Sequence, residues 1–471
     1  MTSETLPVEF RAGERWSGPL TWGQLAIWEV VRWLPPGDAS LNLLHVGDVP
    51  PGRTTRDVAD ALRRLLERHE VLRTRFAPPA DPEPRQTVEP RQTVEPHGRL
   101  DVALVDTAGR PRERVVDELV SRLRSRPFDP AAGLRLRAAV VTSGGAPVAV
   151  VLVFDHLAVD GYSVEIVGRD LRLLLTDGAE LPPRALQPRG RVAYETSDAA
   201  RRRAEQALAY WTDGIRELPG AMLSVDPGPE RRQWARITSR ALRLALRELA
   251  DRHRTSLAML VQALTGLLLG FYRNESRIGI RLIVSTRFTA ETRDYVGAFN
   301  QNGLLRLDLG AEPLAGFLAR ARMASMRAYQ SCECDPLLLE ERIDAIRAER
   351  GLAAGAYCFI NDVRPFDEVR AEGGGGGRDG GGGPDLFARI EAARRHTSVT
   401  ALDRDGRQKG AKFFLFLNAL VDEARLTLAA DGRFLAPGSA QTFLSDLEWL
   451  AVEALSGDRT LPELAAAWSR R

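Results

Sequence analysis

Apolar residues follow two different spacings along this chain, and the two spacings alternate in its first half. Between residues 58 and 66, and again between 115 and 123, apolar residues recur every three to four positions, which predicts two amphipathic helices. Residues 102–105, 134–141 and 147–154 are short apolar runs rich in β-branched side chains, which is typical of strands. The last run predicts a strand buried on both faces. Alternating helices and strands predict an α/β first half.

Several predicted helices are preceded by residues that favour helix starts. Thr21, with Gln24 three residues later, has the pattern of a capping box. Thr54 or Thr55 can cap the helix that contains residues 58–66, and Ser163 can cap a helix through Leu174.

The second half of the chain repeats this plan. Thr255 or Ser256 can cap an apolar helix, and we expect a strand at 278–285, a hairpin at 413–417 and 424–429, and a terminal helix at 439–455. A chain of 471 residues is too long for one ordinary core, so two domains are expected. The prolines and glycines of 177–191 predict a linker between domains of residues 1–176 and 192–471.

Two segments of biased composition predict surface insertions. Residues 84–89, Pro-Arg-Gln-Thr-Val-Glu, are repeated at once as residues 90–95, and we expect this duplication to lie in a mobile surface loop. Nine of the twelve residues 373–384 are glycine, and the segment is expected to be disordered. They lack the Gly-Lys-Ser/Thr ending of a phosphate-binding loop, so a flexible insertion is favoured.

Charge and cysteine content exclude several classes of function. The formal charge is +2, from 65 Lys+Arg against 63 Asp+Glu, which favours neither nucleic acid nor an anionic membrane. No apolar run reaches the roughly 18 residues that span a bilayer, and no leader pattern opens the chain, so we expect a cytoplasmic protein. Cys332 and Cys334, with only Cys358 to join them, fall short of a zinc ligand set, so no metal site is expected.

The strongest candidate for chemistry is His156, which follows the predicted strand 147–154. Asp160 and Gly161 come shortly after it and predict a tight turn. One interpretation is a satisfied core histidine beside an ordinary turn aspartate. The other is an imidazole that faces a cavity, where it can act as a base near neutral pH, with Asp160 turned inward to brace the loop.

This stretch, Asp155-His156-Leu157-Ala158-Val159-Asp160-Gly161, resembles the H-H-x-x-x-D-G motif of nonribosomal peptide synthetase condensation domains. Other motifs of that family recur in order along nearly the whole chain. They are the segments 20–28 (LTWGQLAIW), 68–76 (RHEVLRTRF), 127–130 (PFDP) followed by 134–138 (LRLRA), and 295–302 (YVGAFNQN).

The resemblance implies an α/β fold of two chloramphenicol-acetyltransferase-like subdomains in a V, with the His156 loop in the tunnel between them. It implies that His156 takes a proton or orients the nucleophile, and that the Gly161 backbone N–H is a candidate oxyanion donor. Asp160 is expected to be structural and paired with an arginine, for which Arg287 is favoured and Arg281 is the competitor.

The chain departs from the motif at its first histidine, which is Asp155 here. If this carboxylate faces His156, it raises the pKa of the imidazole; if it points into the scaffold, it supports the loop instead. Motifs of the family near residues 330 and 361 are also weak. These departures keep open a second interpretation, in which the protein is a member of the family that has lost its catalytic activity.

The resemblance implies a freestanding condensation enzyme of specialised metabolism. Its donor is an acyl or peptidyl group on the phosphopantetheine arm of a carrier protein, and its acceptor is an amine or alcohol on a small molecule or a second carrier. No cofactor of its own is expected. The alternatives are an acyltransferase of the same superfamily that uses coenzyme A thioesters, and a recruitment module that binds carriers without turnover.

Overall fold

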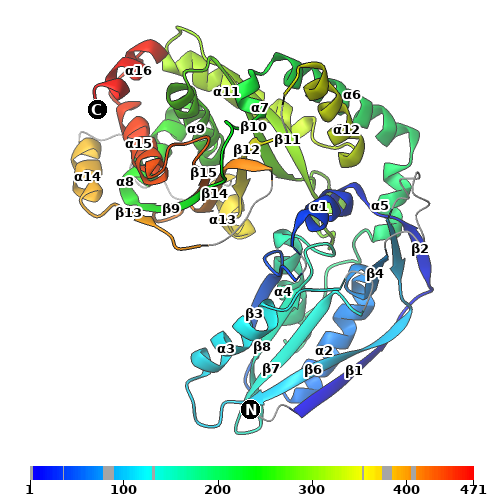
Figure 1. Cartoon of the computed structure of the whole chain (residues 1–471). Helices are drawn as coiled ribbons and strands as arrows, with labels where there is room; N and C mark the ends of the chain where they lie inside the picture. The colour runs from blue at the N-terminus through cyan, green and yellow to red at the C-terminus, as the bar shows by residue number, and fades with distance from the viewer. Residues whose placement is uncertain are drawn as a thin grey trace. The chain divides into compact units, whose positions relative to one another are not determined.

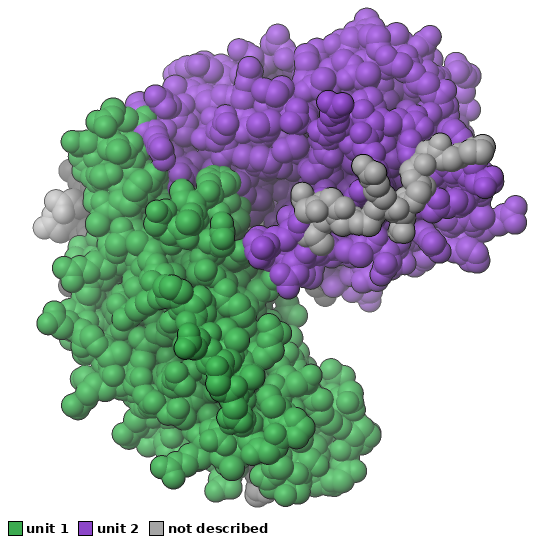
Figure 2. Space-filling view, turned by 180° about the vertical axis from the view of Figure 1, so that it is seen from behind, with its two compact units in different colours: residues 1–202, 285–300 green, residues 203–284, 301–471 purple. Residues whose placement is uncertain are grey.

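The structure is a computed structural model that describes residues 4–35, 37–77, 90–129, 133–352, 355–373, 385–404 and 410–471. The chain divides into two units, coloured separately in Figure 2. Unit 1 contains Met1–Arg202 and Ser285–Asn300, and unit 2 contains Arg203–Val284 and Gln301–Arg471.

This division differs from the predicted boundary at residues 177–191. Those residues belong to unit 1, and a helix already begins within them, at Pro188. The segment Ser285–Asn300 also joins unit 1, although it lies far along the chain in what the sequence assigned to the second domain. The composition of a linker is a local signal, whereas the boundary is set by contacts between residues that are distant in sequence.

Unit 1 is built on a five-stranded sheet with the order β1-β6-β7-β8-β3. Among these described strands only the β6–β7 pair is parallel, so the sheet is not the parallel one that a simple helix–strand alternation favours. A separate three-stranded antiparallel sheet has the order β2-β5-β4. The strands are β1 (Glu4–Arg11), β2 (Trp16–Pro19), β3 (Leu43–Asp48), β4 (Thr74–Ala77), β5 (Arg91–Val94), β6 (His97–Asp106), β7 (Leu136–Ser143) and β8 (Ala146–Phe154).

Several helices of unit 1 begin directly after a side chain that caps them. Thr21 and Thr54 form capping boxes with Gln24 and Asp57, so the first cap and one of the two alternatives for the second are confirmed. The helices are α1 (Trp22–Trp33), α2 (Thr55–Arg68), the 3₁₀ helix η1 (Glu70–Arg73), α3 (Arg112–Arg124), α4 (Gly161–Leu174), α5 (Pro188–Glu195) and α10 (Ala290–Arg293).

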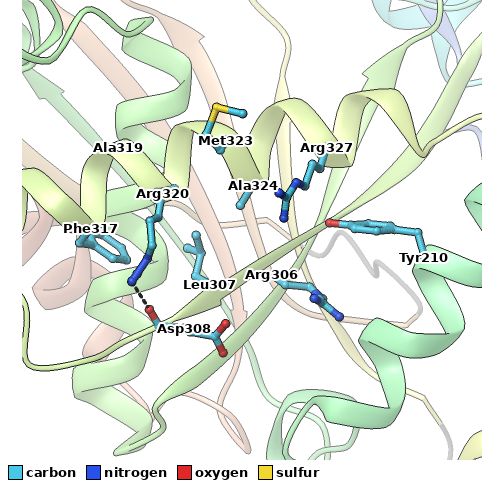
Figure 3. A pocket seen from close by; sticks show the side chains of 11 residues that line it. Tyr210, Arg306, Leu307, Asp308, Phe317, Ala319, Arg320, Met323, Ala324 and Arg327 are labelled. Atoms are coloured by element: carbon cyan, nitrogen blue, oxygen red, sulfur yellow. Dashed lines mark hydrogen bonds between the residues drawn. The ribbon is translucent and has the colours of Figure 1, made fainter.

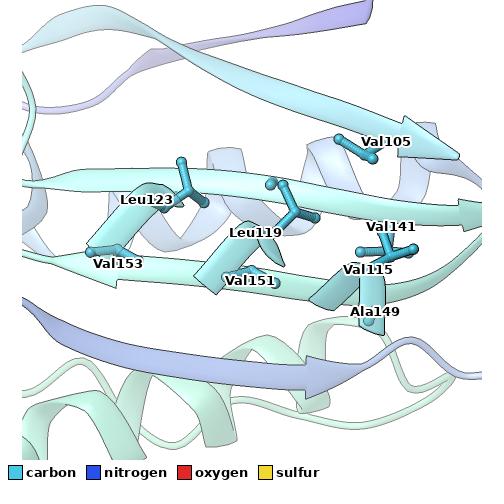
Figure 4. Close-up of a cluster of buried hydrophobic side chains, with 9 residues drawn as sticks. Val105, Val115, Leu119, Leu123, Val141, Ala149, Val151 and Val153 are labelled. Atoms are coloured by element: carbon cyan, nitrogen blue, oxygen red, sulfur yellow. The ribbon is translucent and has the colours of Figure 1, made fainter. Parts of the chain in front are cut away.

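The core of unit 1 lies on both faces of β8, as its apolar run predicts. Figure 4 shows the cluster in which α3 covers one face of the sheet, where its Val115, Leu119 and Leu123 pack over Val151 and Val153 of β8. Alternation along the strand turns Val150, Leu152 and Phe154 to the other face. All these β8 side chains are fully buried. The strand that ends at the candidate site is therefore held rigidly.

Unit 2 is built on a seven-stranded sheet with the order β11-β10-β12-β14-β15-β9-β13 (Figure 1). The pairs from β10 to β14 are parallel and those from β14 to β13 antiparallel. The strands are β9 (Arg232–Ser239), β10 (Arg277–Ser285), β11 (Asn300–Asp308), β12 (Tyr357–Asp362), β13 (Ser398–Ala401), β14 (Ala411–Ala419) and β15 (Ala424–Asp431).

The remaining helices surround this sheet or connect its strands. Ser256 caps α9, which confirms one of the two predicted alternatives. The helices are α6 (Asp198–Glu217), α7 (Gly220–Leu223), α8 (Arg240–His253), α9 (Leu257–Arg273), α11 (Leu314–Gln330), α12 (Pro336–Glu349), α13 (Phe366–Gly373), α14 (Leu386–Arg394), α15 (Ser439–Glu453) and α16 (Leu461–Ser469). The predicted helix at 439–455 is present, but it is not terminal because α16 follows it.

The repeated hexapeptide is placed differently from its prediction as a surface loop. Its second copy, residues 90–95, contains β5, the central strand of the three-stranded sheet. Gln92 and Val94 are buried there, and Gln92 bonds to Gln24 of α1. Residues 84–89 lie outside the described residues, as do residues 374–384 of the glycine-rich run.

None of the helices in the described ranges is both long and apolar enough to cross a membrane alone. The bent pair α8 and α9, at 103°, meets the criteria together by length and composition only.

Candidate active site

The candidate site is the turn that follows β8, and backbone hydrogen bonds fix its shape. The Asp155 carbonyl accepts from the N–H groups of Ala158 (3.0 Å) and Val159 (3.2 Å). The carbonyl of Val159 in turn lies 2.8 Å from Nδ1 of His156. The turn is therefore closed on itself, with the imidazole as one of its bonded parts.

The contact with Val159 determines which nitrogen of the neutral His156 ring carries the proton. A carbonyl oxygen can only accept, so Nδ1 must donate. In the neutral ring Nε2 then carries the lone pair, and the ring is partly exposed. This is the tautomer needed by a base that acts through Nε2. The interpretation as a satisfied core histidine therefore fits only Nδ1, which is bonded within the turn. It does not fit Nε2 on the partly exposed ring.

Asp160 has two roles, one in the helix and one in an ion pair. Its Oδ1 accepts from the backbone N–H of Ser163 at 2.8 Å, so Asp160 is the N-cap of α4. The prediction that Ser163 caps this helix was wrong, since Ser163 lies in the first turn and donates its hydroxyl to Asp160. Asp160 also accepts from the Phe299 N–H at 3.1 Å.

Arg287 is the cation opposite Asp160, as favoured from the sequence. It donates Nη1 to Oδ2 at 2.7 Å and Nη2 to Oδ1 at 2.9 Å, a two-pronged contact in which the Arg287 and Asp160 side chains are 4% and 1% exposed. Arg287 also donates to the carbonyls of Tyr295 and Gly297. The competitor Arg281 lies in unit 2, where it pairs with Glu340 at 2.5 Å.

A second buried ion network joins α4 to the same segment 285–300, and no sequence pattern pointed to it. Asp170 is fully buried and lies 3.0 Å from Nε2 of His69, 2.9 Å from Nε of Arg68 and 2.8 Å from Nη2 of Arg169. Arg169 also reaches Asp294 at 2.5 Å. Its components, scattered over three segments of the chain, share no spacing that could be recognised.

Burial lowers the pKa of His69, so its ring is neutral at neutral pH and Nε2–H donates to Asp170. Burial opposes ionisation of Asp170 too, but the hydrogen bonds from His69 and Arg169 and the charge of Arg169 outweigh it and hold the pKa of this carboxyl below its ordinary value. His69 is therefore a structural histidine.

Gly161 is the first residue of α4 and is exposed. A β-carbon added to it would meet open space, so nothing within the described fold demands glycine here. The first N–H groups of a helix lack intrahelical acceptors and carry partial positive charge. Asp160 takes the N–H of Ser163, and the role of Gly161 as an oxyanion donor stays a prediction.

Asp155, which stands where the motif has its first histidine, points into the scaffold. Its Oδ1 accepts from the Leu157 N–H and its Oδ2 from Nη1 of Arg135, both at 3.0 Å. The sequence left open whether this carboxylate faces His156 or points into the scaffold, and the structure shows that it points into the scaffold. Arg135 belongs to the 134–138 motif segment, but nothing in its spacing identified it as this partner.

Unit 2 contains a cavity of about 440 Å³ that is separate from these residues. Figure 3 shows Tyr210 of α6, Arg306 and Asp308 of β11, and Met323 and Arg327 of α11 around it. The carboxylate in its lining, Asp308, pairs with Arg277 at 3.2 Å. None of the described residues that line this cavity is a histidine or cysteine.

The structure also bears on the cysteines. All three are buried, and burial raises the pKa of Cys334 to about 12 and that of Cys358 to about 11, which keeps both thiols protonated. Among the described residues, no three His, Cys, Asp or Glu side chains form a group that could hold a metal ion.

Comparison with known proteins finds one family. The family model described as "Condensation domain" matches residues 28–345, more than half of the chain. The chain is 31% identical over 353 residues to phosphinothricin tripeptide synthetase PhsC of Streptomyces viridochromogenes, which covers 71% of this chain and 31% of PhsC. It is 29% identical over 366 residues to the AMB antimetabolite synthetase AmbB of Pseudomonas aeruginosa, covering 75% of this chain and 28% of AmbB. The chain thus spans less than a third of either curated relative.

Solved structures share the fold at lower identity. SgcC5 of Streptomyces globisporus is 17% identical with a TM-score of 0.64, and the match covers 94% of this chain and all of SgcC5. The condensation domain of the monacolin K polyketide synthase MokA is 16% identical with a TM-score of 0.71, over 95% and 99% of the two chains. The X-domain from teicoplanin biosynthesis is 18% identical with a TM-score of 0.67, over 94% and 96%.

Proposed function

The chain belongs to the condensation-domain family, and on this premise we propose that it transfers an acyl or peptidyl group from a carrier-protein thioester to an amine or alcohol. The family acts on substrates tethered to a carrier by phosphopantetheine, which makes this arm part of the donor substrate. The observation that carries the proposal is the bonded state of His156, whose Nδ1 is taken by Val159 while Nε2 keeps its lone pair.

The reaction balances without a covalent enzyme intermediate. Nε2 of His156 accepts or orients the proton of the attacking N–H or O–H as the new bond to the acyl carbon forms. The carbon–sulfur bond breaks, the proton passes to the leaving phosphopantetheine thiolate, and the products are an amide or ester and a free thiol. General-base help of this kind contributes about 10²- to 10⁴-fold.

Charge on the tetrahedral oxyanion needs donors at the same place. The N-terminus of α4 begins at Gly161, within the turn that carries His156. Its backbone N–H is our proposed donor, aided by the positive end of the helix. Asp160 and Arg287 are proposed to be structural, because both are engaged by several hydrogen bonds within unit 1.

We also propose that the two units correspond to the two acetyltransferase-like subdomains that the resemblance implies. We propose a freestanding enzyme, and SgcC5 is a structural neighbour that the match covers over the whole of its solved chain. SgcC5 was crystallised with a diol, so alcohols belong among the acceptors to be tested.

The experiment presents one acyl group, octanoyl, on a carrier protein, on coenzyme A and on pantetheine, each with a panel of amines and alcohols. Product is measured by mass spectrometry. A higher kcat/KM with the carrier supports the proposal, because tethering and docking raise the effective concentration of the donor. Equal values for all three donors favour an acyltransferase that uses coenzyme A thioesters. Carrier binding without turnover favours a recruitment module. This hypothesis is tested because Asp155 replaces the first histidine of the motif.

His156→Ala tests the site within the same assay. It is expected to lower kcat by about 10²- to 10⁴-fold without changing the melting temperature greatly, because the ring is partly exposed. His396→Ala, which replaces an exposed histidine of unit 2, is the matched control and should leave the rate unchanged. Equal activity of the two variants would remove His156 from the mechanism.

A further inference from the structure

Arg135 is a fully buried arginine directly before β7, beside the turn that carries His156. Its Nη1 donates to Oδ2 of Asp155, and its Nη2 donates to the carbonyls of Asp129 (2.7 Å) and Gly133 (3.1 Å). A buried guanidinium requires a balancing carboxylate and acceptors in good geometry. Here the balancing carboxylate is the residue that precedes His156.

The backbones of the same two residues are bonded as well. The Asp155 N–H donates to the Arg135 carbonyl at 3.2 Å, at the end of the β7–β8 ladder where Leu136 pairs with Phe154. Arg135 is anchored on its other side, since its N–H donates to the Leu72 carbonyl at 3.4 Å. A main-chain contact and an ion pair thus fix Asp155 against a rigid sheet.

From Asp155 the bonding continues to the imidazole. Its Oδ1 holds the Leu157 N–H and its carbonyl holds the N–H groups of Ala158 and Val159, which directs the Val159 carbonyl to Nδ1 of His156. Each step in this series is a hydrogen bond of 2.8–3.2 Å. The orientation and tautomer of His156 therefore depend on how Asp155 is held.

We propose that Arg135 is a positioning residue for His156. By pairing with Asp155 it holds the turn in the shape that places the proton on Nδ1 and leaves Nε2 as the base. Only the role of Nε2 as a base rests on the proposed function. The tautomer itself is a property of the protein without substrate. It also means that Asp155 acts on His156 through geometry, since the charge of the carboxylate is balanced by Arg135.

The test reads the tautomer directly, from the ¹⁵N chemical shifts of labelled histidine side chains at a pH where the ring is neutral. His156→Gln identifies the His156 signals by their loss. The unmodified protein is expected to show a single Nδ1–H tautomer for His156. Arg135→Met should give the mixture of tautomers typical of a free histidine, because the Val159 carbonyl is no longer held in place.

Arg137→Met is the matched control. Arg137 lies two residues further along, in β7, and donates to the carbonyls of Leu123, Arg126 and Pro127, but it makes no hydrogen bond to Asp155 among those of the described residues. Its variant should keep the tautomer of His156. A mixture in Arg137→Met as well, or an unchanged tautomer in Arg135→Met, overturns the proposal.

A double variant, Arg135→Met with Asp155→Leu, covers the case in which the single variant fails to fold. Replacing both members of a buried ion pair by apolar residues is often neutral or stabilising. This variant should therefore melt near the unmodified protein and still show mixed tautomers, because the Leu157 N–H has lost its acceptor. A retained Nδ1–H tautomer here would overturn the proposal.

Turnover separates this inference from the proposed function. If the octanoyl-carrier assay shows activity, Arg135→Met should lower kcat about 10-fold or more with little change in KM, and Arg135→Lys should recover part of the loss. A changed KM with an unchanged kcat speaks against positioning. If the unmodified protein has the Nδ1–H tautomer but no turnover, the proposed function fails while the positioning role stands.

Discussion

The ion pair between Arg287 and Asp160 provides the sharpest test of how unit 1 is held together. The change is Arg287→Met, which keeps an unbranched side chain and removes the charge and all donors. Asp160 would keep the N–H groups of Ser163 and Phe299 as partners, but its buried charge would lose its cation. The segment 285–300 would lose the bonds from Arg287 to the Tyr295 and Gly297 carbonyls.

The expected magnitude follows from the burial of this pair. Removing one partner of a buried ion pair costs about 3–5 kcal/mol, because the other charge is left without compensation. Both side chains here are nearly inaccessible, so solvent screens them little. For a unit of about 150–250 residues, 1 kcal/mol shifts the melting temperature by about 2–4 °C, so we expect a loss of about 6–20 °C for unit 1.

The assay is calorimetry combined with amide hydrogen exchange, which assigns the loss to a unit. Faster exchange is expected in α4 and in residues 295–300, with β9 and β15 of unit 2 unaffected. Arg293→Met is the matched control, since Arg293 is an exposed arginine of the same segment, and its effect should stay within about 0.5 kcal/mol. Arg287→Lys keeps the charge without the two-pronged contact, so it should fall between the two.

Two results would refute this reasoning. One is a loss below about 1 kcal/mol for Arg287→Met, which would mean that the pair contributes no more than an exposed one. The other is an equal loss for Arg293→Met, which would show that the segment responds to any change in charge.

Three further changes test other parts of the structure. Asp155→Asn should lower the free energy of unfolding by about 1–3 kcal/mol, because it leaves Arg135 without its carboxylate. It should leave the pH–rate profile unchanged. A shifted profile would show a direct effect of the Asp155 charge on His156. Burial lowers the pKa of Lys412 to about 8 in the folded protein, so between pH 8 and its ordinary pKa of 10.5 this group binds more protons in the unfolded chain, and its own contribution to stability rises with pH by roughly 2–3 kcal/mol. Lys412→Met should remove this rise, which denaturant titrations at both ends of the range will measure. Deleting residues 84–89 or 90–95 gives the same sequence, which retains the β5 strand, so the melting temperature should hold within about 2 °C; a large fall would show that both copies are needed.

The local elements of this fold could be predicted because their signals are local. The β-branched run of β8 and the Thr21–Gln24 capping box depend on neighbouring residues, and both were confirmed. The start of α4 was misplaced because Asp160 and Ser163 are both good caps, and only the structure shows that the Asp160 side chain accepts from Ser163. The strand β5 was missed because its register depends on β2 and β4, which come from distant parts of the chain.

The candidate site could be predicted in part, because the motif that carries His156 is also a local signal. The motif around His156 identified the turn, and the resemblance led to Arg287, which the structure pairs with Asp160. Arg135 escaped notice because the sequence of 134–138 does not show which of its two arginines is buried against Asp155. The chain departs from the family motif at Asp155. Only the structure shows that the partner of Asp155 is Arg135.

The membership of residues 285–300 in unit 1 has a consequence for how the protein is made. Asp160 leaves the ribosome before its partner, which lies 127 residues further along. At about 5–20 residues per second, this interval lasts roughly 6–25 s. During that time Asp160 lacks its partner Arg287 while the first helices and strands of unit 2 emerge. The first unit therefore finishes folding only after the second has begun, which delays the candidate active site until the chain has passed residue 300.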